Sequence, residues 1–430
     1  MRIAIIGAGV AGLTAAHRLD PQHDVTVFEA GSYAGGHTNT ITVDDPHVGT
    51  LAVDTGFIVL NDRTYPHFTA LLDDLGVATQ PTHMGFSVST EEGLDDFEYA
   101  GTPRGLFCQP RNLVRPAFHR MVGELLRFNR ELEQERLTGG TRTLGAMLDE
   151  GGYSRLFVDR LIVPQVSAVW SADPDQMWTF PAGFLAQFFH NHGMLSLRDR
   201  PQWQTVAGGS NTYVAAIERR LARAVRTDTP VARVTRHPTH VEVVTETTGV
   251  AEQFDEVILA CHSDQALALL ADPSPAEREI LGAIPYQQNE AVLHSDASLL
   301  PRRRQARQAW NFHLLAEPRD RTTVTYWMNH LQRLPTPQDY CVTLNLSDRI
   351  DPAHVLRRIS YAHPVFTPGG IAAQARHGEI SGARRTHYCG AYWRWGFHED
   401  GVWSALQAIR DLEGPALAAP GREPLAELAA

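Results

Sequence analysis

The sequence predicts an α/β protein, in which a Rossmann-like dinucleotide-binding domain is assembled from discontinuous segments and carries an inserted α+β substrate domain. Two observations at the N-terminus predict the first domain: a buried strand that runs into a glycine-rich turn and a helix, and a second strand that ends in an acid. The third observation is a strand followed by a helix near the C-terminus. Because these segments lie far apart in the chain, the domain is expected to be discontinuous.

The first segment, RIAIIGAGVAGLTAAHRL, reads as a strand, a turn and an alanine-rich helix. Gly7, Gly9 and Gly12 fit the G-x-G-x-x-G spacing, with Ala11 beside the third glycine. In this motif the first glycine permits a tight turn, the second lets the backbone approach a pyrophosphate, and the third allows close contact between helix and strand. The free N–H groups at the helix N-terminus favour phosphate binding. This context predicts a bound dinucleotide.

The next strand, DVTVFEA, ends at Glu29, which lies seventeen residues after Gly12. In a dinucleotide-binding domain an acid at about this distance holds a ribose hydroxyl. Glu29 is therefore predicted to contact the cofactor.

Composition narrows the protein class. The 430-residue chain has a net charge of −11 and a pI near 6.0, so no nucleic-acid partner is expected. No apolar run approaches the roughly 18 residues of a membrane span, and no signal peptide is expected because the first strand begins at once. The four cysteines have no CxxC spacing, which predicts neither a zinc site nor disulfides. We expect a cytoplasmic protein with no metal.

The chain contains no lysine, so all 38 basic residues are arginine. Codon bias in a GC-rich genome is the simplest cause. Whatever the cause, chemistry that needs a Schiff-base lysine, a lysine general base or a lysine-held water is excluded.

The residues after the second strand indicate which dinucleotide binds. The stretch AGSYAGGHTNT contains Gly35 and Gly36, and VDTGFIV follows with Thr55 and Gly56. This series resembles the flavin amine-oxidase superfamily, which includes amine oxidases, phytoene desaturases and protoporphyrinogen oxidases. The resemblance implies non-covalent FAD, with the glycine pair at the diphosphate and the later strand beside the flavin. His37 stands where the superfamily has arginine, so a neutral or partly charged contact replaces a permanent cation.

The C-terminal stretch THYCGAYWRWGFHEDGVWSALQAIRDL resembles the superfamily's last strand and helix. The resemblance implies that Gly390 lies at the diphosphate or ribityl, and that Glu399, Asp400 and Gly401 open a helix that faces the flavin. A helix N-terminus there stabilises negative charge on the reduced ring.

Between the two ends, TPVARVTRHPTHVEVVT alternates like a β-hairpin, and FDEVILACH reads as a buried strand. By resemblance, Val231 in the hairpin contacts the adenine through its backbone. The expected FAD-binding domain comprises residues 1–60, 205–285 and 385–414, the substrate domain comprises residues 61–204 and 286–384, and residues 415–430 form a flexible tail.

The inserted domain contains the apolar stretch FPAGFLAQFFHNHGMLSL, residues 180–197, which suits a buried apolar site. His190 and His192 would share one face of a strand, but no third ligand lies near them, so a metal site is not expected. Residues 115–136 predict an amphipathic helix whose arginines suit either an anionic membrane surface or water. The arginine-rich segment 301–307 is predicted to be a solvated loop.

The sequence contains one dinucleotide fingerprint and no second one for NAD(P)H. We therefore expect the substrate itself to reduce the flavin, by hydride transfer from a carbon atom to flavin N5. The stretches VDTGFIVLNDRTYP, RPQWQTVAGGSNTYV and CGAYWRWGFHEDG resemble a bacterial subgroup commonly encoded beside cyclopropane-fatty-acyl synthases. That resemblance implies dehydrogenation of an unsaturated or methyl-branched fatty acyl chain, because hydride loss from an unactivated alkane is very hard.

Two other functions stay open. A flavin amine oxidase needs an aromatic cage, half of which Tyr392 with Trp393 or Trp395 could form, but the lysine typical of those enzymes is absent. A non-catalytic flavin- or lipid-binding protein is the second alternative. For catalysis, the candidates are Tyr392 and His398, which border the flavin by motif position, and His192 in the insert as an acid or base.

Overall fold

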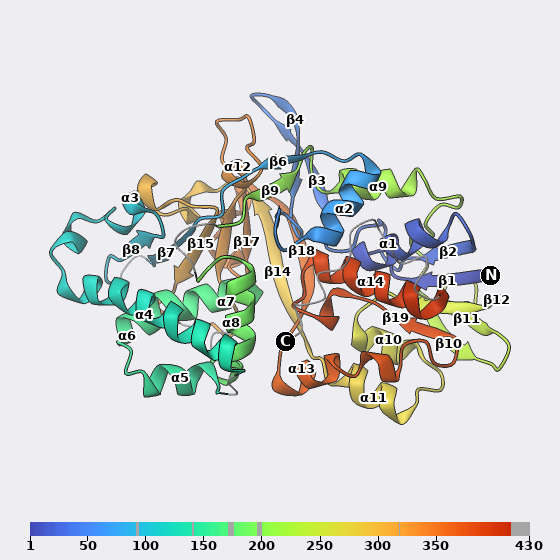
Figure 1. Cartoon of the computed structure of the whole chain (residues 1–430). Helices are drawn as coiled ribbons and strands as arrows, with labels where there is room; N and C mark the ends of the chain where they lie inside the picture. The colour runs from blue at the N-terminus through green and yellow to red at the C-terminus, as the bar shows by residue number, and fades with distance from the viewer. Residues whose placement is uncertain (92–93, 140–141, 171–175, 196–199, 318, 414–430) are drawn as a thin grey trace.

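The computed structural model describes residues 1–91, 94–139, 142–170, 176–195, 200–317 and 319–413. Two halves lie side by side in Figure 1, and the long strands β14 (Tyr286–His294) and β18 (Val355–Pro364) run between them. The half on the right contains the N-terminal strand and the last helix, and the half on the left contains a second sheet covered by helices.

The right-hand half is built on a four-stranded parallel sheet. In spatial order its strands are β19 (Thr386–Tyr388), β13 (Glu256–Leu259), β1 (Arg2–Ile6) and β2 (Asp24–Phe28). Because the strands are parallel, their carboxyl ends meet at one edge, where ligands bind in sheets of this kind. The α/β class and the Rossmann-like core predicted from the sequence are confirmed.

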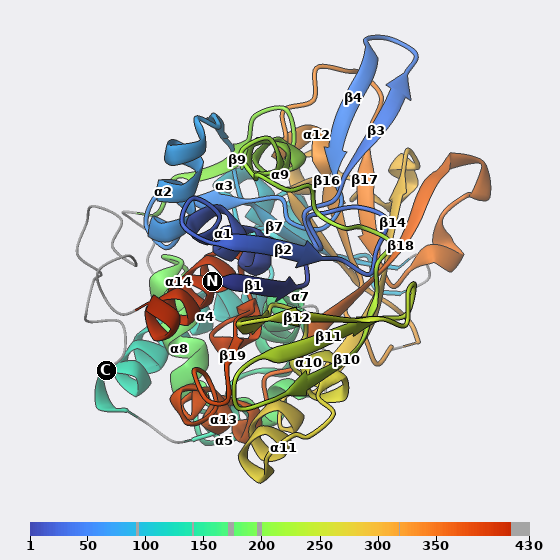
Figure 2. The same ribbon diagram turned by 90° about the vertical axis from the view of Figure 1, so that its right-hand side faces the viewer.

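Both faces of this sheet are covered, because alternate residues of β1 enter two different cores: Ile3 and Ile5 pack against one layer, and Ala4 and Ile6 against the other. The first layer contains α1 (Val10–Leu19), α2 (Pro66–Leu75), α9 (Asn211–Glu218) and α14 (His398–Glu413). The second layer, which lies lower than the first in Figure 2, contains β10 (Val231–Arg236), β11 (Val241–Thr245), β12 (Ala251–Phe254), α10 (Ser263–Leu269), α11 (Pro275–Gly282) and α13 (Pro368–Gln374).

The left-hand half contains a seven-stranded sheet. Its order is β18, β14, β17 (Cys341–Leu344), β16 (Val324–Trp327), β15 (Trp310–Leu314), β7 (Phe86–Thr90) and β8 (Glu98–Ala100). Neighbouring strands are antiparallel except β15 and β7. The hairpin of β3 (Thr40–Asp45) and β4 (Gly49–Asp54) and the short helix α12 (Met328–Leu331) pack in one core with β14, β16 and β17.

Helices cover the other end of this sheet around a core of phenylalanine, leucine and methionine side chains. They are α4 (Pro116–Thr138), α5 (Leu144–Glu150), α6 (Arg155–Phe157), α7 (Val163–Trp170) and α8 (Ala182–Asn191). The short helix α3 (Pro103–Leu106) precedes them, and a small sheet of β5 (Leu60–Asn61), β9 (Trp203–Val206) and β6 (Thr79–Pro81) joins the two halves.

Most elements predicted from the sequence are confirmed, including the hairpin of β10 and β11, the buried strand β13 and the final helix α14. His190 and His192, however, lie at the end of helix α8 and not on a strand. Two positions along a helix differ by about 200° in direction. His190 consequently lies beside Glu133 with 47% of its side chain exposed, whereas His192 is buried.

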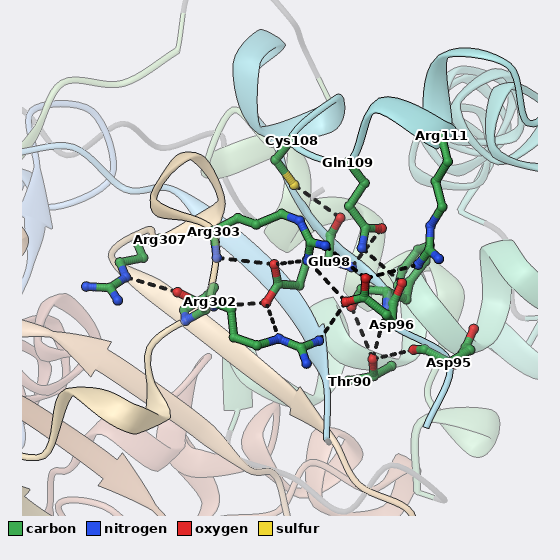
Figure 3. Close-up of polar contacts among 12 residues, drawn as sticks. Thr90, Asp95, Asp96, Glu98, Cys108, Gln109, Arg111, Arg302, Arg303 and Arg307 are labelled. Carbon is green, nitrogen blue, oxygen red and sulfur yellow. Dashed lines mark hydrogen bonds and ion pairs between the residues drawn. The ribbon is translucent and has the colours of Figure 1, made fainter. Parts of the chain in front are cut away.

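The prediction of a solvated loop at residues 301–307 holds for Arg302, whose side chain is 51% exposed, but it missed the pairing of Arg302 and Arg303 with acids. Glu98, which is 1% exposed, accepts hydrogen bonds from the backbone N–H of Arg302 and from Nη1 of Arg303. Both guanidinium groups also reach Asp96, at 2.7 and 2.8 Å (Figure 3). A buried carboxylate needs such partners, so the loop is held to β8 by charge pairing that the local sequence does not reveal.

In the described part of the chain, no helix is both long and apolar enough to cross a membrane. The flexible tail predicted at residues 415–430 lies outside the described residues.

Candidate cofactor and substrate site

A cavity of about 1710 Å³ runs from the carboxyl edge of the parallel sheet toward helices α4 and α8. Residues at or just past the ends of the four parallel strands line one end, namely Gly7, Glu29, Ala260 and Gly390. Leu126 of α4 and Phe188 of α8 line the other end. The cavity therefore begins where the fold class places a dinucleotide and continues into the helical layer.

The glycines of the first turn have different roles. Gly7 has a φ of +105°, and a Cβ atom added there would lie 2.8 Å from the carbonyl oxygen of Ala260. A Cβ atom at Gly12 would lie 1.9 Å from the carbonyl oxygen of Gly7. Gly9 has a φ of −74°, lines the cavity beside Ala11, and has nothing within 4 Å of an added Cβ atom. The fold needs Gly7 and Gly12, whereas Gly9 leaves room for a ligand.

Glu29 lines the cavity directly after β2. Its two carboxylate oxygens accept hydrogen bonds from the N–H groups of Ala8 and Gly31, both at 2.8 Å. Each oxygen keeps a further lone pair, so the carboxylate can also accept hydrogen bonds from ribose hydroxyls. Val231, the first residue of β10, lines the same region.

The second glycine turn packs against the first. Gly35 and Gly36 have φ values of +129° and +60°, and a Cβ atom at Gly36 would lie 3.2 Å from Cα of Gly9. The next residue, His37, lines the cavity, and its Nε2 atom is buried without a hydrogen-bond partner. A buried polar atom of this kind calls for a partner that the protein does not supply.

His37 belongs to a cluster of rings on the cavity wall. Its ring lies 4.9 Å from that of Tyr361, 5.2 Å from His363 and 6.4 Å from His262. Burial is the main cause that lowers the pKa of His37 well below its usual value, and His363, His262 and His398 lower it further. Burial also lowers the pKa of His363 to about 4. The imidazoles are therefore neutral near pH 7 when only protein surrounds them.

Thr55 and Gly56 support this cluster. The Thr55 hydroxyl donates to the carbonyl oxygen of Asn39 and lies 3.0 Å from the Tyr361 hydroxyl. A Cβ atom at Gly56 would lie 2.2 Å from the carbonyl oxygen of His37, so the two segments approach more closely than a side chain allows. Gly56 lines the cavity, whereas Thr55 does not.

Gly390 and Tyr392 close the cavity beyond β19. The N–H of Gly390 donates to the Ser404 hydroxyl at 2.8 Å, which fixes the strand end to α14. The hydroxyl of Tyr392 is buried without a hydrogen-bond partner, and burial raises the pKa of this phenol well above its usual value. Tyr392 therefore stays protonated and can donate a hydrogen bond to a ligand.

Of the predicted residues at the start of α14, the first lines the cavity and the next three do not. His398 lines the cavity, stacks on Phe57 at 3.6 Å and lies 2.8 Å from the Thr38 hydroxyl through Nε2. Burial lowers the pKa of His398 to about 3, so the ring is neutral.

Glu399, Asp400 and Gly401 are not among the cavity-lining residues in the described chain. Glu399 instead accepts hydrogen bonds from the N–H groups of His67 and Phe68, and so caps the start of α2. Burial raises the pKa of Asp400 to about 7, and Gly401 packs against α1, where a Cβ atom would lie 2.6 Å from Val10.

His192 lines the cavity at the end of α8. Its Nδ1 atom lies 2.9 Å from the carbonyl oxygen of Phe188, which requires a proton on Nδ1 and leaves the lone pair on Nε2. Burial lowers the pKa of His192 to about 4. The neutral ring stacks on Phe188 at 3.9 Å, so its orientation is fixed.

The part of the cavity toward the helices is apolar. Its lining includes Met121, Leu125, Leu126, Leu161, Val169 and Phe188. Among the described residues that line the whole cavity, Glu29 is the one carboxylate and Arg200 the one guanidinium, accompanied by seven histidines. The wall suits a mainly apolar molecule and carries little fixed charge.

His262, His363 and Tyr361 were not predicted from the sequence. His262 comes three residues after β13, and the rule that ligands bind at strand carboxyl ends could have identified it. His363 and Tyr361 lie on β18, where no local motif marks them.

The residues fit a dinucleotide. The glycine turns leave free space at Gly9, Glu29 offers acceptors for ribose, and His37 Nε2 and the Tyr392 hydroxyl are buried polar atoms without protein partners.

The sequence model of the family described as flavin-containing amine oxidoreductase matches residues 10–293. A Mycobacterium tuberculosis protein named as a flavin-containing monoamine oxidase is 28% identical over 295 residues, which are 63% of this chain and 59% of that relative. The chain thus matches less than two thirds of the relative's length.

Two solved structures resemble the whole fold. Cyclohexylamine oxidase from Brevibacterium oxydans aligns with a TM-score of 0.67 and 16% identity, covering 96% of this chain and 99% of that one. A fatty acid isomerase from P. acnes that produces CLA aligns with a TM-score of 0.65 and 17% identity, covering 95% and 98%. At these identities the likeness concerns the fold.

Proposed function

This chain belongs to the flavin-containing amine oxidoreductase family, and from that premise we propose that it is an FAD-dependent oxidoreductase that dehydrogenates an unsaturated or methyl-branched fatty acyl chain. The single observation that carries the substrate class is the apolar continuation of the cavity toward α4 and α8. Along the whole cavity, the described lining includes one carboxylate, Glu29 at the cofactor end, and one guanidinium. An aliphatic guest gains free energy from burial there, whereas an ammonium ion would lose its hydration.

We assign the cofactor end of the cavity to FAD. The turn at Gly9 takes the diphosphate, Glu29 the ribose, and His37 and Tyr392 the remaining polar groups. Cys389 is fully buried and burial raises its thiol pKa, so it suits non-covalent binding rather than a flavin link. When bound, the flavin supplies a hydride acceptor at N5.

Dehydrogenation removes a hydride and a proton from two carbon atoms, which leaves a new double bond. His192 takes the proton in this proposal, because its Nε2 lone pair lies on a ring that is held in place and lines the cavity. Tyr392 donates a hydrogen bond toward the ligand, and His398 keeps its neighbours in position through Thr38 and Phe57. An allylic carbon provides the activation that hydride loss requires.

The direct test is anaerobic mixing of the oxidised protein with unsaturated or methyl-branched acyl phospholipids, with the flavin absorbance recorded. Bleaching by such lipids, with the unsaturated product found by mass spectrometry, supports the proposal. Bleaching by benzylamine or spermine with no response to any acyl lipid contradicts it.

The alternative is a flavin amine oxidase. It draws support from the cavity lining, because Tyr392 and Trp395 both line the cavity and form part of an aromatic wall. Trp393 does not contribute to that wall, since it is 3% exposed and packs with Tyr388 in a core. The lack of lysine argues against this alternative.

We also propose that this protein acts in the cytoplasm and takes its substrate from an anionic membrane surface. Leu113 is 56% exposed and Val114 81% exposed just before α4, and Leu126 of α4 is 44% exposed while also lining the cavity. Residues 103–139 contain seven arginines and four glutamates, a net charge of +3 in a chain of net charge −11. An exposed apolar pair beside excess arginine is the composition of an interfacial surface.

Co-sedimentation with vesicles tests this surface. Phosphatidylglycerol vesicles should bind the protein more strongly than phosphatidylcholine vesicles, and V114D should weaken that binding. The control V250D changes a residue that is 65% exposed between β11 and β12, and this variant should bind the vesicles normally. Equal binding to both kinds of vesicle, or binding to neither, contradicts the membrane proposal. Either result has no bearing on the proposed dehydrogenation.

A further inference from the structure

Three potential metal ligands meet at the turn between β10 and β11, away from the cavity. His237 follows β10, His240 precedes β11, and Glu242 is the second residue of β11. The N–H of His237 donates to the carbonyl oxygen of His240 at 2.8 Å, which closes the turn and brings both rings to the same side. The rings stack at 4.5 Å with an interplanar angle of 17°.

The distances between the donor atoms suit a small tetrahedral ion. Nε2 of His237 lies 3.3 Å from one Glu242 oxygen, and Nε2 of His240 lies 3.6 Å from the other. One ligand atom from each residue can be chosen so that all three lie within 4.8 Å of one another. A tetrahedral zinc ion with bonds of about 2.0–2.1 Å holds its ligand atoms about 3.3–3.4 Å apart.

The two imidazoles are paired with the Glu242 carboxylate, but neither Nε2 atom makes a hydrogen bond of good geometry to it. Both Nε2 atoms are buried, and neither has a hydrogen-bond partner, even though a carboxylate is near. A cation between the three groups would satisfy all of them once the two rings turn out of their stack, because an imidazole nitrogen binds a metal in the plane of its ring.

The surroundings favour an ion with nitrogen ligands. The Thr239 hydroxyl lies 3.1 Å from Nδ1 of His240, a contact that can hold the tautomer whose lone pair is on Nε2. Magnesium and calcium prefer oxygen ligands, whereas zinc, cobalt, nickel and copper accept imidazole. The three side chains are 28–37% exposed, which leaves a fourth position open to water.

We propose that His237, His240 and Glu242 form a binding site for a divalent transition-metal ion of the zinc type, which clamps the hairpin of β10 and β11. None of the three residues lines the cavity, so the site is structural and separate from the flavin chemistry. The opposite end of β10 contributes Val231 to the cavity wall, so the clamp acts on an element that also serves the cofactor.

Equilibrium dialysis of the tag-free, chelator-treated full chain against ZnCl₂ tests the site. The wild type should bind one zinc ion per chain, whereas H237A/H240A should bind none, and E242Q should bind more weakly. Zinc should raise the melting temperature of the wild type and not of the double variant, while MgCl₂ and CaCl₂ change neither.

H47A/H119A is the matched control, because it removes two exposed histidines elsewhere and should keep the bound zinc. Cobalt in place of zinc should give the visible absorption of a tetrahedral site in the wild type and the control. Absence of zinc from the wild type overturns the proposal, as does retention of zinc by H237A/H240A. Flavin content reports separately on folding of the double variant.

Discussion

The ring of His37 stacks on the ring of Tyr361 at 4.9 Å with an interplanar angle of 26°, while its Nε2 atom stays buried without a partner. The stack fixes the ring in the cavity wall, and the free nitrogen marks where a polar ligand belongs. Because histidine, unlike arginine, is not permanently charged, the local charge at this position depends on protonation.

The first prediction is that FAD binding takes up protons. His37, with His262 and His363 beside it, is neutral in the protein alone because burial lowers its pKa, and the diphosphate favours the charged imidazole. The pKa is then higher in the complex, so affinity should fall as pH rises, by at most about tenfold per pH unit for each proton taken up.

Calorimetric titration of FAD into the FAD-free protein, in two buffers of different ionisation enthalpy, measures the uptake. Glutamine in H37Q cannot take up a proton. This variant should therefore lower the number of protons taken up per FAD bound by up to one. Identical heats in both buffers for the wild type would show that no proton moves.

The second prediction contrasts Gly9 with Gly12. G9V should fold but lose FAD, because its side chain enters open space in the cavity. G12V should lower the yield of folded protein itself, because a Cβ atom there meets the Gly7 carbonyl at 1.9 Å. Circular dichroism reports the fold and absorbance near 450 nm the bound flavin. Full flavin occupancy in folded G9V would falsify the assignment of this turn.

The third prediction concerns the proton acceptor. H192A should keep FAD and slow flavin reduction by an acyl lipid by about 100-fold or more, the usual contribution of a general base. H190A changes the exposed neighbour on the same helix and should react at the wild-type rate. Stopped-flow absorbance measures both, and equal rates in the two variants would remove His192 from the mechanism.

The fourth prediction is a rise in the stability of the FAD-free protein between about pH 4 and pH 6.5. Several histidines have a pKa lowered mainly by burial to about 4 or below, and the unfolded chain binds protons at them near 6.5. They are His192, His294, His313, His363 and His398. The unfolded state therefore binds more protons in this window, so stability falls as pH falls.

Two buried acids act in the opposite direction. Burial raises the pKa of Asp54 to about 6 and that of Asp400 to about 7. Ionisation of each buried acid therefore lowers the stability of the folded protein as pH rises. Because the histidines outnumber the two acids, the midpoint of urea unfolding should be higher at pH 6.5 than at pH 4.5. The m-value, which is the slope of the unfolding free energy against urea concentration, should be unchanged. A higher midpoint at pH 4.5 would mean that the histidines are not buried neutral.

The fifth prediction is that acid precipitation releases all the flavin into the supernatant. Cys389 is fully buried, and burial raises the pKa of its thiol, so a thiolate is not available for a covalent link. C389A should release the same amount. If the wild-type pellet stays yellow and the C389A pellet does not, Cys389 is linked covalently to the flavin.

The sequence alone determined the cofactor half of this protein, because its signals are local. The spacing of Gly7, Gly9 and Gly12 encodes the turn, and the buried strand at 256–259 and the helix from 398 follow from short patterns. Each of these depends on steric or hydrogen-bonding rules that act over a few residues.

Only the tertiary structure decided which side chains share the cavity wall and which support it. His37, His262 and His363 are separated by more than a hundred residues in each step along the chain, yet their rings lie within 6.4 Å of His37. Glu399, next to the cavity-lining His398, turns away to cap α2, and the arginines at 302 and 303 find carboxylates some two hundred residues earlier. A sequence pattern records what a residue can do, but the partner of a buried charge or ring is chosen by packing between distant segments.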